Sequence, residues 1–122
     1  MTIIEAINRI DDAKPNQYTQ SDKVRWLSAL DGIVHDEILA AHEGEAGAFD
    51  GYDDSTDLST VLLVEPPYDE VYIRWLEAQI DYTNGEYGRY NNSMAMYNAA
   101  YSTFARFYNR THMPRGGKIQ YY

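Results

Sequence analysis

The sequence predicts a mainly α-helical protein, a small bundle of about four helices with an acidic loop, a short extended segment near 60–64 and an extended C-terminal tail. Three observations favour this fold class. Apolar residues recur every three or four positions, hydroxyl residues stand where helix caps are expected, and glycine and proline clusters separate the periodic segments. The length of 122 residues fits one domain with its own core. We therefore expect a helical domain at 1–114 and a tail at 115–122.

Two helices are predicted in the first third of the chain. Thr2 and Glu5 have the spacing of a capping box, and the helix that follows should end near Asp12. A second helix should begin at Thr19 or Ser21 and stop at Gly44. Its inward face, widened by Trp26 and Ile33, should be formed by Val24, Leu27, Leu30, Val34, Ile38 and Ala41.

The middle of the chain predicts a loop, and the second half predicts further helix. Residues 44–57 hold three glycines and five acidic residues, which is typical of a mobile acidic loop. Residues 60–64 are either a brief extended segment or a buried linker, closed by Pro66-Pro67. Two helices, or one bent helix, should follow, with an interruption at 84–88.

The charge is distributed unevenly along the chain. The net charge is −9, but residues 1–86 hold all 19 acidic and five of the ten basic residues, giving −14. Residues 87–122 carry +5 and no acidic residue. This separation either indicates an interaction surface or is neutralised within the fold.

No feature of the sequence nominates a catalyst, a cofactor site or a metal site, so we expect a protein that is not an enzyme. The absence of cysteine excludes disulfides, cysteine zinc sites and thiol nucleophiles. Phosphate-binding and nucleophile-elbow motifs are also missing. His35 and His42 are seven positions apart, which does not suit chelation by neighbouring helix turns. No apolar run approaches the length of a membrane span.

Tyrosine is the most conspicuous residue type, with twelve in the chain. A heptad-like stripe steps by four and three through Tyr90, Met94, Tyr97, Tyr101, Phe104 and Tyr108. Because tyrosine is enriched at protein interfaces, the candidate subunit-interface residues are Tyr90, Tyr97, Tyr101 and Tyr108. The alternative is an amphipathic core stripe whose hydroxyl groups reach water.

The candidate partner-binding residues are Arg106, Arg110, Arg115, Lys118, Tyr121 and Tyr122. Basic and aromatic residues together can also bind single-stranded nucleic acid, although the acidic remainder argues against this.

A set of segments, which together span most of the chain, carries a resemblance to a known family. They are Lys14-Pro15-Asn16, Lys23 to Leu27, Val64 to Tyr72, Gln79 to Tyr87, Tyr90 to Ser93, and Arg110 to Pro114. In these segments the chain resembles the head–tail connector (head completion or adaptor) proteins of tailed phages that infect Gram-positive bacteria.

The resemblance implies a structural virion protein that forms a homo-oligomeric ring on the portal vertex, twelvefold to match a portal. Such a ring extends the DNA channel without sequence-specific DNA binding and docks the next tail-side component, a completion or stopper protein. It assembles in the host cytoplasm and ends in the neck of the virion. In similar connectors the C-terminal segment reaches toward the portal protein, a role that would fall on Arg115 to Tyr122.

A second function class is compatible with the composition. The −14 charge of residues 1–86 would suit a small acidic phage regulator, or a DNA mimic that binds a DNA-binding protein. The aromatic stripe and basic tail do not favour it, because a mimic needs spaced surface carboxylates.

Overall fold

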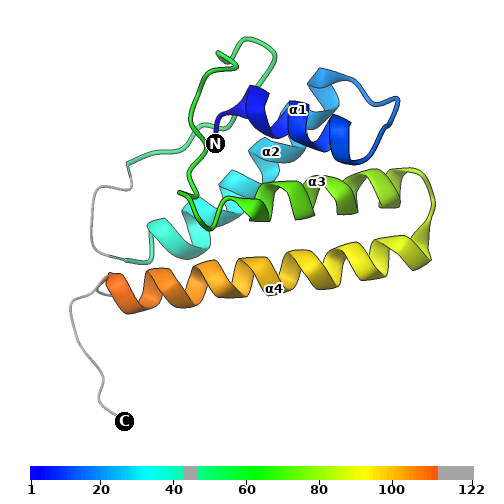
Figure 1. The fold of residues 1–122 in the computed structure, drawn as a ribbon. Helices are drawn as coiled ribbons and strands as arrows, with labels where there is room; N and C mark the ends of the chain where they lie inside the picture. Colours follow the sequence, from blue (N-terminus) through cyan, green and yellow to red (C-terminus); the bar gives the residue numbers. More distant parts are fainter. Residues whose placement is uncertain (43–46, 113–122) are drawn as a thin grey trace.

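The computed structural model describes residues 1–42 and 47–112, and this part of the chain forms four α-helices. They are α1 (Ile3–Ala13), α2 (Gln20–Val34), α3 (Glu70–Thr83) and α4 (Tyr87–Thr111), with a π-helical turn, η1 (His35–Leu39), directly after α2. Figure 1 shows α1 and α2 on one side, α3 in the middle and α4 along the opposite side. The predicted fold class is confirmed: the protein is a small, mainly α-helical bundle.

The first helix is capped as its sequence predicts. The Thr2 hydroxyl accepts a hydrogen bond from the Glu5 amide at 3.2 Å, and the Glu5 carboxylate accepts one from the Thr2 amide at 3.0 Å. The amides of Ile3 and Ile4 donate to the carbonyl groups of Thr60 and Leu58, each at 3.0 Å. The segment before α3 therefore satisfies amides that a helix N-terminus otherwise leaves unpaired.

The second helix begins as predicted and departs from α-helical geometry earlier than predicted. Thr19 and Asp22 form its capping box, but the α-helix ends at Val34 and is followed by the π turn rather than by α-helix up to Gly44. The Ala40 amide donates to the His35 carbonyl at 2.8 Å, the hydrogen bond that widens this turn. Ile33 does not belong to the inward face, since 36% of its surface stays exposed.

The predicted extended segment near 60–64 contributes one isolated bridge, between Thr2 and Val61, and no strand is present in the parts of the chain that the structure describes. Leu62 and Val64 are buried, so these residues act mainly as a buried linker across the bundle. The following Pro66–Pro67 peptide bond is cis.

The second half of the chain is a helical hairpin of two separate helices. The turn lies at 84–86, where Gly85 adopts a φ of 76° that favours glycine. Gly88, the second glycine of the 84–88 interruption, lies inside the first turn of α4. Gly85 therefore lies at the break between the two helices, and Gly88 does not.

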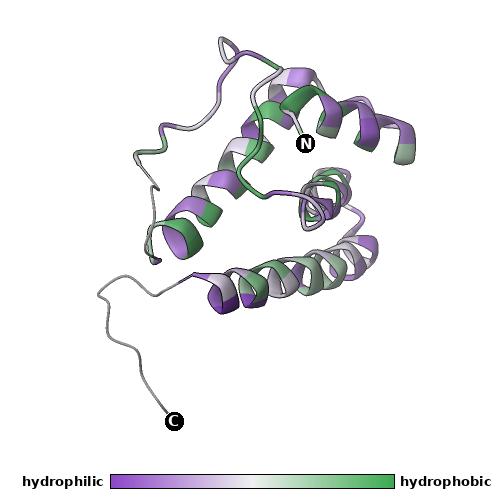
Figure 2. Ribbon diagram, turned by 60° about the vertical axis from the view of Figure 1, so that its left-hand side comes forward, coloured by the Kyte–Doolittle hydropathy of each residue, from purple (hydrophilic) through white to green (hydrophobic). Residues whose placement is uncertain are grey.

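The hydrophobic core lies where α1, α2 and the 62–64 linker meet α3. Figure 2 shows α3 end-on between the other helices, with α4 forming a separate outer layer. The largest fully buried side chains in this core include Ile3, Ile10, Leu27, Leu30, Tyr72, Leu76 and Ile80. Because α4 packs mainly against α3, its opposite side remains open to solvent.

Candidate interaction surfaces

The aromatic stripe of α4 faces inward, onto α3. Tyr97 and Phe104 retain only 7% and 3% of their surface, and the Tyr97 ring lies 5.0 Å from the Trp75 ring. Burial also raises the pKa of Tyr97, to about 12. The Tyr97 side chain thus packs in the core of its own chain, which leaves little of its surface for a contact with another subunit.

The other three interface candidates keep part of their surface. Tyr101 is half-buried and donates a hydrogen bond to Glu37 at 2.8 Å, which fastens α4 to the π turn. Tyr108 is stacked on His112, with ring centres 3.6 Å apart. Tyr90 lies at the start of α4, next to Tyr82. A subunit contact through these three tyrosines stays a prediction.

The outward side of α4 carries no charge over most of its length. Residues 90–105 contain neither an acidic nor a basic residue, although 24% of the whole chain is charged. Met96 is half exposed on this side.

The C-terminal part of α4 is basic. Arg106 and Arg110 are both exposed and form no ion pair with any residue that the structure describes. These two candidate partner-binding residues therefore form an open basic end. Four further candidates, Arg115, Lys118, Tyr121 and Tyr122, lie outside the described residues.

The acidic loop lies on the other side of the molecule from α4. In Figures 1 and 2 the 47–60 segment runs beside α1 and α2. Tyr52 attaches it to α2, since the Tyr52 amide donates to the Ser28 hydroxyl at 2.9 Å. The exposed carboxylates of this segment are Asp50, Asp53, Asp54 and Asp57. The exposed aspartates of this loop and the two exposed arginines of α4 thus lie on different sides of the fold.

Two of these carboxylates stabilise the loop itself. Asp53 accepts hydrogen bonds from the amide and hydroxyl of Ser55, at 2.8 and 2.6 Å, and Asp57 accepts the same pair from Ser59 at 2.8 Å. These hydrogen bonds lower the pKa of both aspartates. They form local turns of the kind that aspartate favours.

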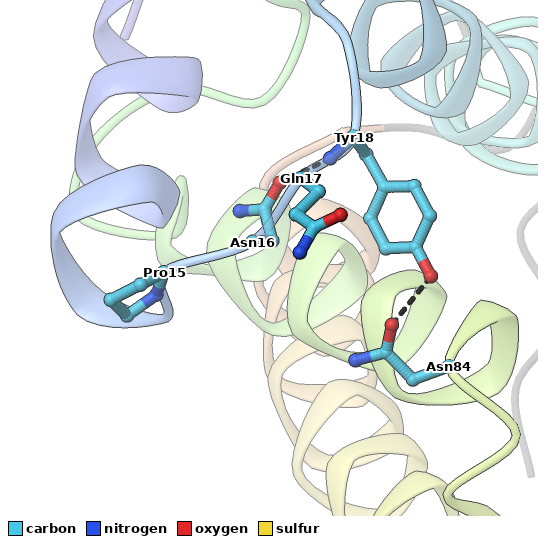
Figure 3. A pocket seen from close by; sticks show the side chains of 5 residues that line it. All are labelled: Pro15, Asn16, Gln17, Tyr18 and Asn84. Atoms are coloured by element: carbon cyan, nitrogen blue, oxygen red, sulfur yellow. Dashed lines mark hydrogen bonds between the residues drawn. The ribbon is translucent and has the colours of Figure 1, made fainter.

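A shallow pocket lies near the N-terminal end of α4, where the α1–α2 connection meets the hairpin turn. It is lined by Pro15, Asn16, Gln17, Tyr18 and Asn84. Figure 3 shows the Tyr18 hydroxyl pointing at the Asn84 amide, to which it donates a hydrogen bond. The Asn16 carboxamide is used by the backbone, because it accepts from the Tyr18 amide at 3.0 Å. The side chains that line the pocket thus hold the α1–α2 connection in place against the hairpin turn.

Three tyrosines gather beside this pocket on the hairpin end. The Tyr82 ring lies 5.8 Å from Tyr87 and 5.1 Å from Tyr90, in edge-to-face contact. Tyr82 and Tyr87 are 55% and 60% exposed. Exposed aromatic clusters are typical of interaction surfaces, and the tyrosine count alone did not locate this one.

A buried carboxylate, which the sequence analysis missed, joins four segments of the fold. Asp31 of α2 accepts hydrogen bonds from the hydroxyls of Tyr52 and Tyr72, at 2.5 and 2.6 Å, and from the Leu63 amide at 3.1 Å. Burial raises the pKa of Asp31, and the three hydrogen bonds offset only part of that effect. Asp31 has no route to solvent, so it is a structural group rather than a candidate acid catalyst.

His42 connects the end of the π turn to α4. Its Nδ1 lies 2.6 Å from the Ile38 carbonyl oxygen, and its Nε2 lies 2.6 Å from the Asn109 side-chain oxygen. Within residues 1–42 and 47–112, no three histidine, aspartate or glutamate side chains are grouped so as to hold a metal ion. No helix in this part of the chain has the length and apolar character to cross a membrane.

The described surface thus offers an uncharged outer side of α4, a basic end on the same helix, an acidic loop on the opposite side, and a tyrosine cluster at the hairpin end. None of these groups a nucleophile with a base. Comparison with protein-family models, with curated proteins and with solved structures found no match to this chain.

Proposed function

We propose that this chain is a structural virion protein, a head–tail connector that forms a homo-oligomeric ring on the portal vertex. The ring would extend the DNA channel and dock the next tail-side component, so that the protein acts in the neck of the virion after assembly in the host cytoplasm. The similar segments named above support this proposal. The described surface of the bundle brings no nucleophile together with a base, which is compatible with a structural role.

The observation that carries the proposal is the placement of charge on opposite sides of the fold. The exposed aspartates at 50–57 lie beside α1 and α2, whereas Arg106 and Arg110 lie on α4. A ring is built from heterologous contacts, in which one face of a subunit meets a different face of its neighbour. A basic end on one side and an acidic loop on the other supply such a complementary pair.

The same charge distribution is compatible with DNA passing through the ring. Phosphate groups are attracted by clustered lysine and arginine and repelled by carboxylates. If the acidic loops faced the channel, DNA would slide with little adhesion.

Native mass spectrometry of the full chain, alone and mixed with a candidate portal protein at low ionic strength, tests this proposal. We expect a closed ring or a stoichiometric complex with the portal. Reversing the basic end, with Arg106→Glu and Arg110→Glu together, should weaken that assembly because the electrostatic attraction becomes repulsion.

Arg25→Glu is the control for reversal of Arg106 or Arg110 alone, because each of these single changes alters the net charge equally. Arg25 is 68% exposed on α2, on the acidic side of the molecule, so this change alters charge without touching the basic end. Loss of assembly in both variants would point to net charge alone. Unchanged assembly after reversal at Arg106 and Arg110 would refute the polarity argument.

The exposed acidic loop favours a second candidate, a small regulator or DNA mimic that captures a DNA-binding protein. Two of its four aspartates have an oxygen committed to the loop's own turns, which limits their freedom to imitate phosphates. A stable monomer that binds neither portal nor itself, but binds a basic DNA-binding protein in competition with duplex DNA, would favour this candidate over the connector.

A further inference from the structure

An apolar cavity of about 240 Å³ lies at the C-terminal end of α4. Leu39 of the π turn and Leu63 of the linker form one wall, and Phe104 and Phe107 of α4 form the other. The exposed carboxylate of Glu65 also lines it. Glu65 forms no ion pair with any residue in the described ranges.

The size and lining of this cavity indicate the kind of group that fits it. Small-molecule sites usually measure about 300–1,000 Å³, so this cavity is too small for most such ligands and suits one or two side chains. Its apolar walls favour an aliphatic or aromatic side chain. The Glu65 carboxylate favours a cation close to that side chain, so a basic segment with an apolar anchor is the best match.

The residues that directly follow the cavity in the chain have this composition. His112, the last residue that the structure describes, itself lines the cavity. The next ten residues include Arg115 and Lys118, no acidic residue, and the apolar or aromatic residues Ile119, Tyr121 and Tyr122. We propose that this cavity is the binding site for the 115–122 segment of the same chain, with Ile119 as the apolar anchor and Lys118 beside Glu65.

The length of the connecting chain allows this contact. Ile119 lies seven positions after His112, and an extended chain of that length reaches roughly 23–25 Å. Gly116 and Gly117 provide the backbone freedom needed for the reversal. A short covalent link also gives the segment an effective concentration in the millimolar range, which favours the chain's own tail over that of a second copy.

The contact is intramolecular, so it goes beyond the proposed function and holds whether or not the chain forms a ring. If the chain is a connector, the segment expected to reach the portal is held in this cavity before assembly. Portal binding then competes with self-binding.

A single spin label on the full chain tests the contact. The chain has no cysteine, so Gln120→Cys creates one attachment site for a nitroxide next to the proposed anchor. In a methyl- and amide-labelled sample, we expect loss of the Leu39 and Leu63 methyl signals and an unchanged amide signal from Gly85. Gly85 precedes the start of α4, a helix of 25 residues, roughly 37 Å at about 1.5 Å per residue.

Two substitutions and one mixing experiment decide the outcome. Ile119→Asp in the labelled chain should weaken the broadening of the Leu39 and Leu63 signals, because the released segment spends less time at the cavity, whereas Ile119→Val should leave the broadening unchanged. Broadening that Ile119→Asp does not change, or no broadening at all, overturns the proposal. A sample that mixes isotope-labelled chains with separately spin-labelled chains detects contacts between molecules. Broadening of the Leu39 and Leu63 signals in that mixture assigns the cavity to a second copy and also overturns the proposal.

Discussion

Tyr72 donates a hydrogen bond from its hydroxyl to Asp31 Oδ1 at 2.6 Å, linking α3 to α2 across 41 positions of sequence. The same hydroxyl accepts a hydrogen bond from the Val64 amide at 2.7 Å. Both Tyr72 and Asp31 are fully buried. The pair therefore fixes the linker against two helices at a point that water does not reach, where each unmade hydrogen bond is costly.

We expect Tyr72→Phe to lower the free energy of unfolding by about 1–3 kcal/mol. The change removes little volume but leaves the Val64 amide without its acceptor and Asp31 with one donor fewer. Urea unfolding followed by circular dichroism measures it. Tyr87→Phe is the control, because Tyr87 is 60% exposed and should change stability by less than about 0.5 kcal/mol. Equal effects in the two variants would contradict a special role for the buried hydroxyl.

The raised pKa of Asp31 predicts how stability depends on pH. Because the folded chain holds this proton more tightly than the unfolded chain, the favourable contribution is complete below the ordinary aspartate pKa of about 4. It is lost as the pH rises through the folded-state value. The stability of the parent chain relative to Asp31→Asn should therefore be greatest near pH 4 and decrease toward pH 7. A difference that is constant or grows with pH would contradict this assignment.

The helices could be predicted from the sequence because their signals are local. The hydroxyl and carboxylate at Thr2 and Glu5 are three residues apart, and the apolar steps of α4 identify its buried side without any tertiary information. The π turn after Val34 was not predictable in this way. It is one extra residue in a helical turn, and the residues at 35–39 carry no sequence signal for it.

The polar core and the two pockets could not be predicted, because they depend on residues far apart in sequence. Asp31 has an ordinary place in a helical pattern, and only the fold brings Tyr52, Tyr72 and Leu63 to it. The aromatic stripe of α4 shows a second limit of prediction from sequence. Periodicity identified the side of α4 that packs, but it could not tell packing against α3 from packing against another subunit.

The capping box of α2 gives a third prediction. Thr19→Ala removes the acceptor for the Asp22 amide, 3.1 Å away, and should lower stability by about 1 kcal/mol. Thr19→Ser keeps the hydroxyl and should recover most of that loss. Chemical denaturation of both variants measures the difference. If alanine and serine were equivalent at position 19, the cap would contribute nothing measurable.

The contact between Lys14 and Asp81 gives the last prediction, because the two partners differ in exposure. Lys14 Nζ lies 2.7 Å from Asp81 Oδ1, as an ion pair outside hydrogen-bond geometry. The Ser93 hydroxyl donates to the other oxygen of Asp81. The side chain of Asp81 is 1% exposed and that of Lys14 is 24% exposed. Only Lys14 can turn toward water when its partner is removed.

A double-mutant cycle with Lys14→Met and Asp81→Asn should therefore be asymmetric. Lys14→Met leaves a buried carboxylate without its cation and should cost about 2–3 kcal/mol, below the value for a wholly buried pair because Lys14 is partly exposed. In the Asp81→Asn background the same lysine change should cost less than about 0.5 kcal/mol, because no buried charge remains to be compensated. Unfolding free energies of the four chains at neutral pH measure the coupling. Equal costs of Lys14→Met in the two backgrounds would mean that Asp81 is stabilised by Ser93 and its helical surroundings rather than by the lysine.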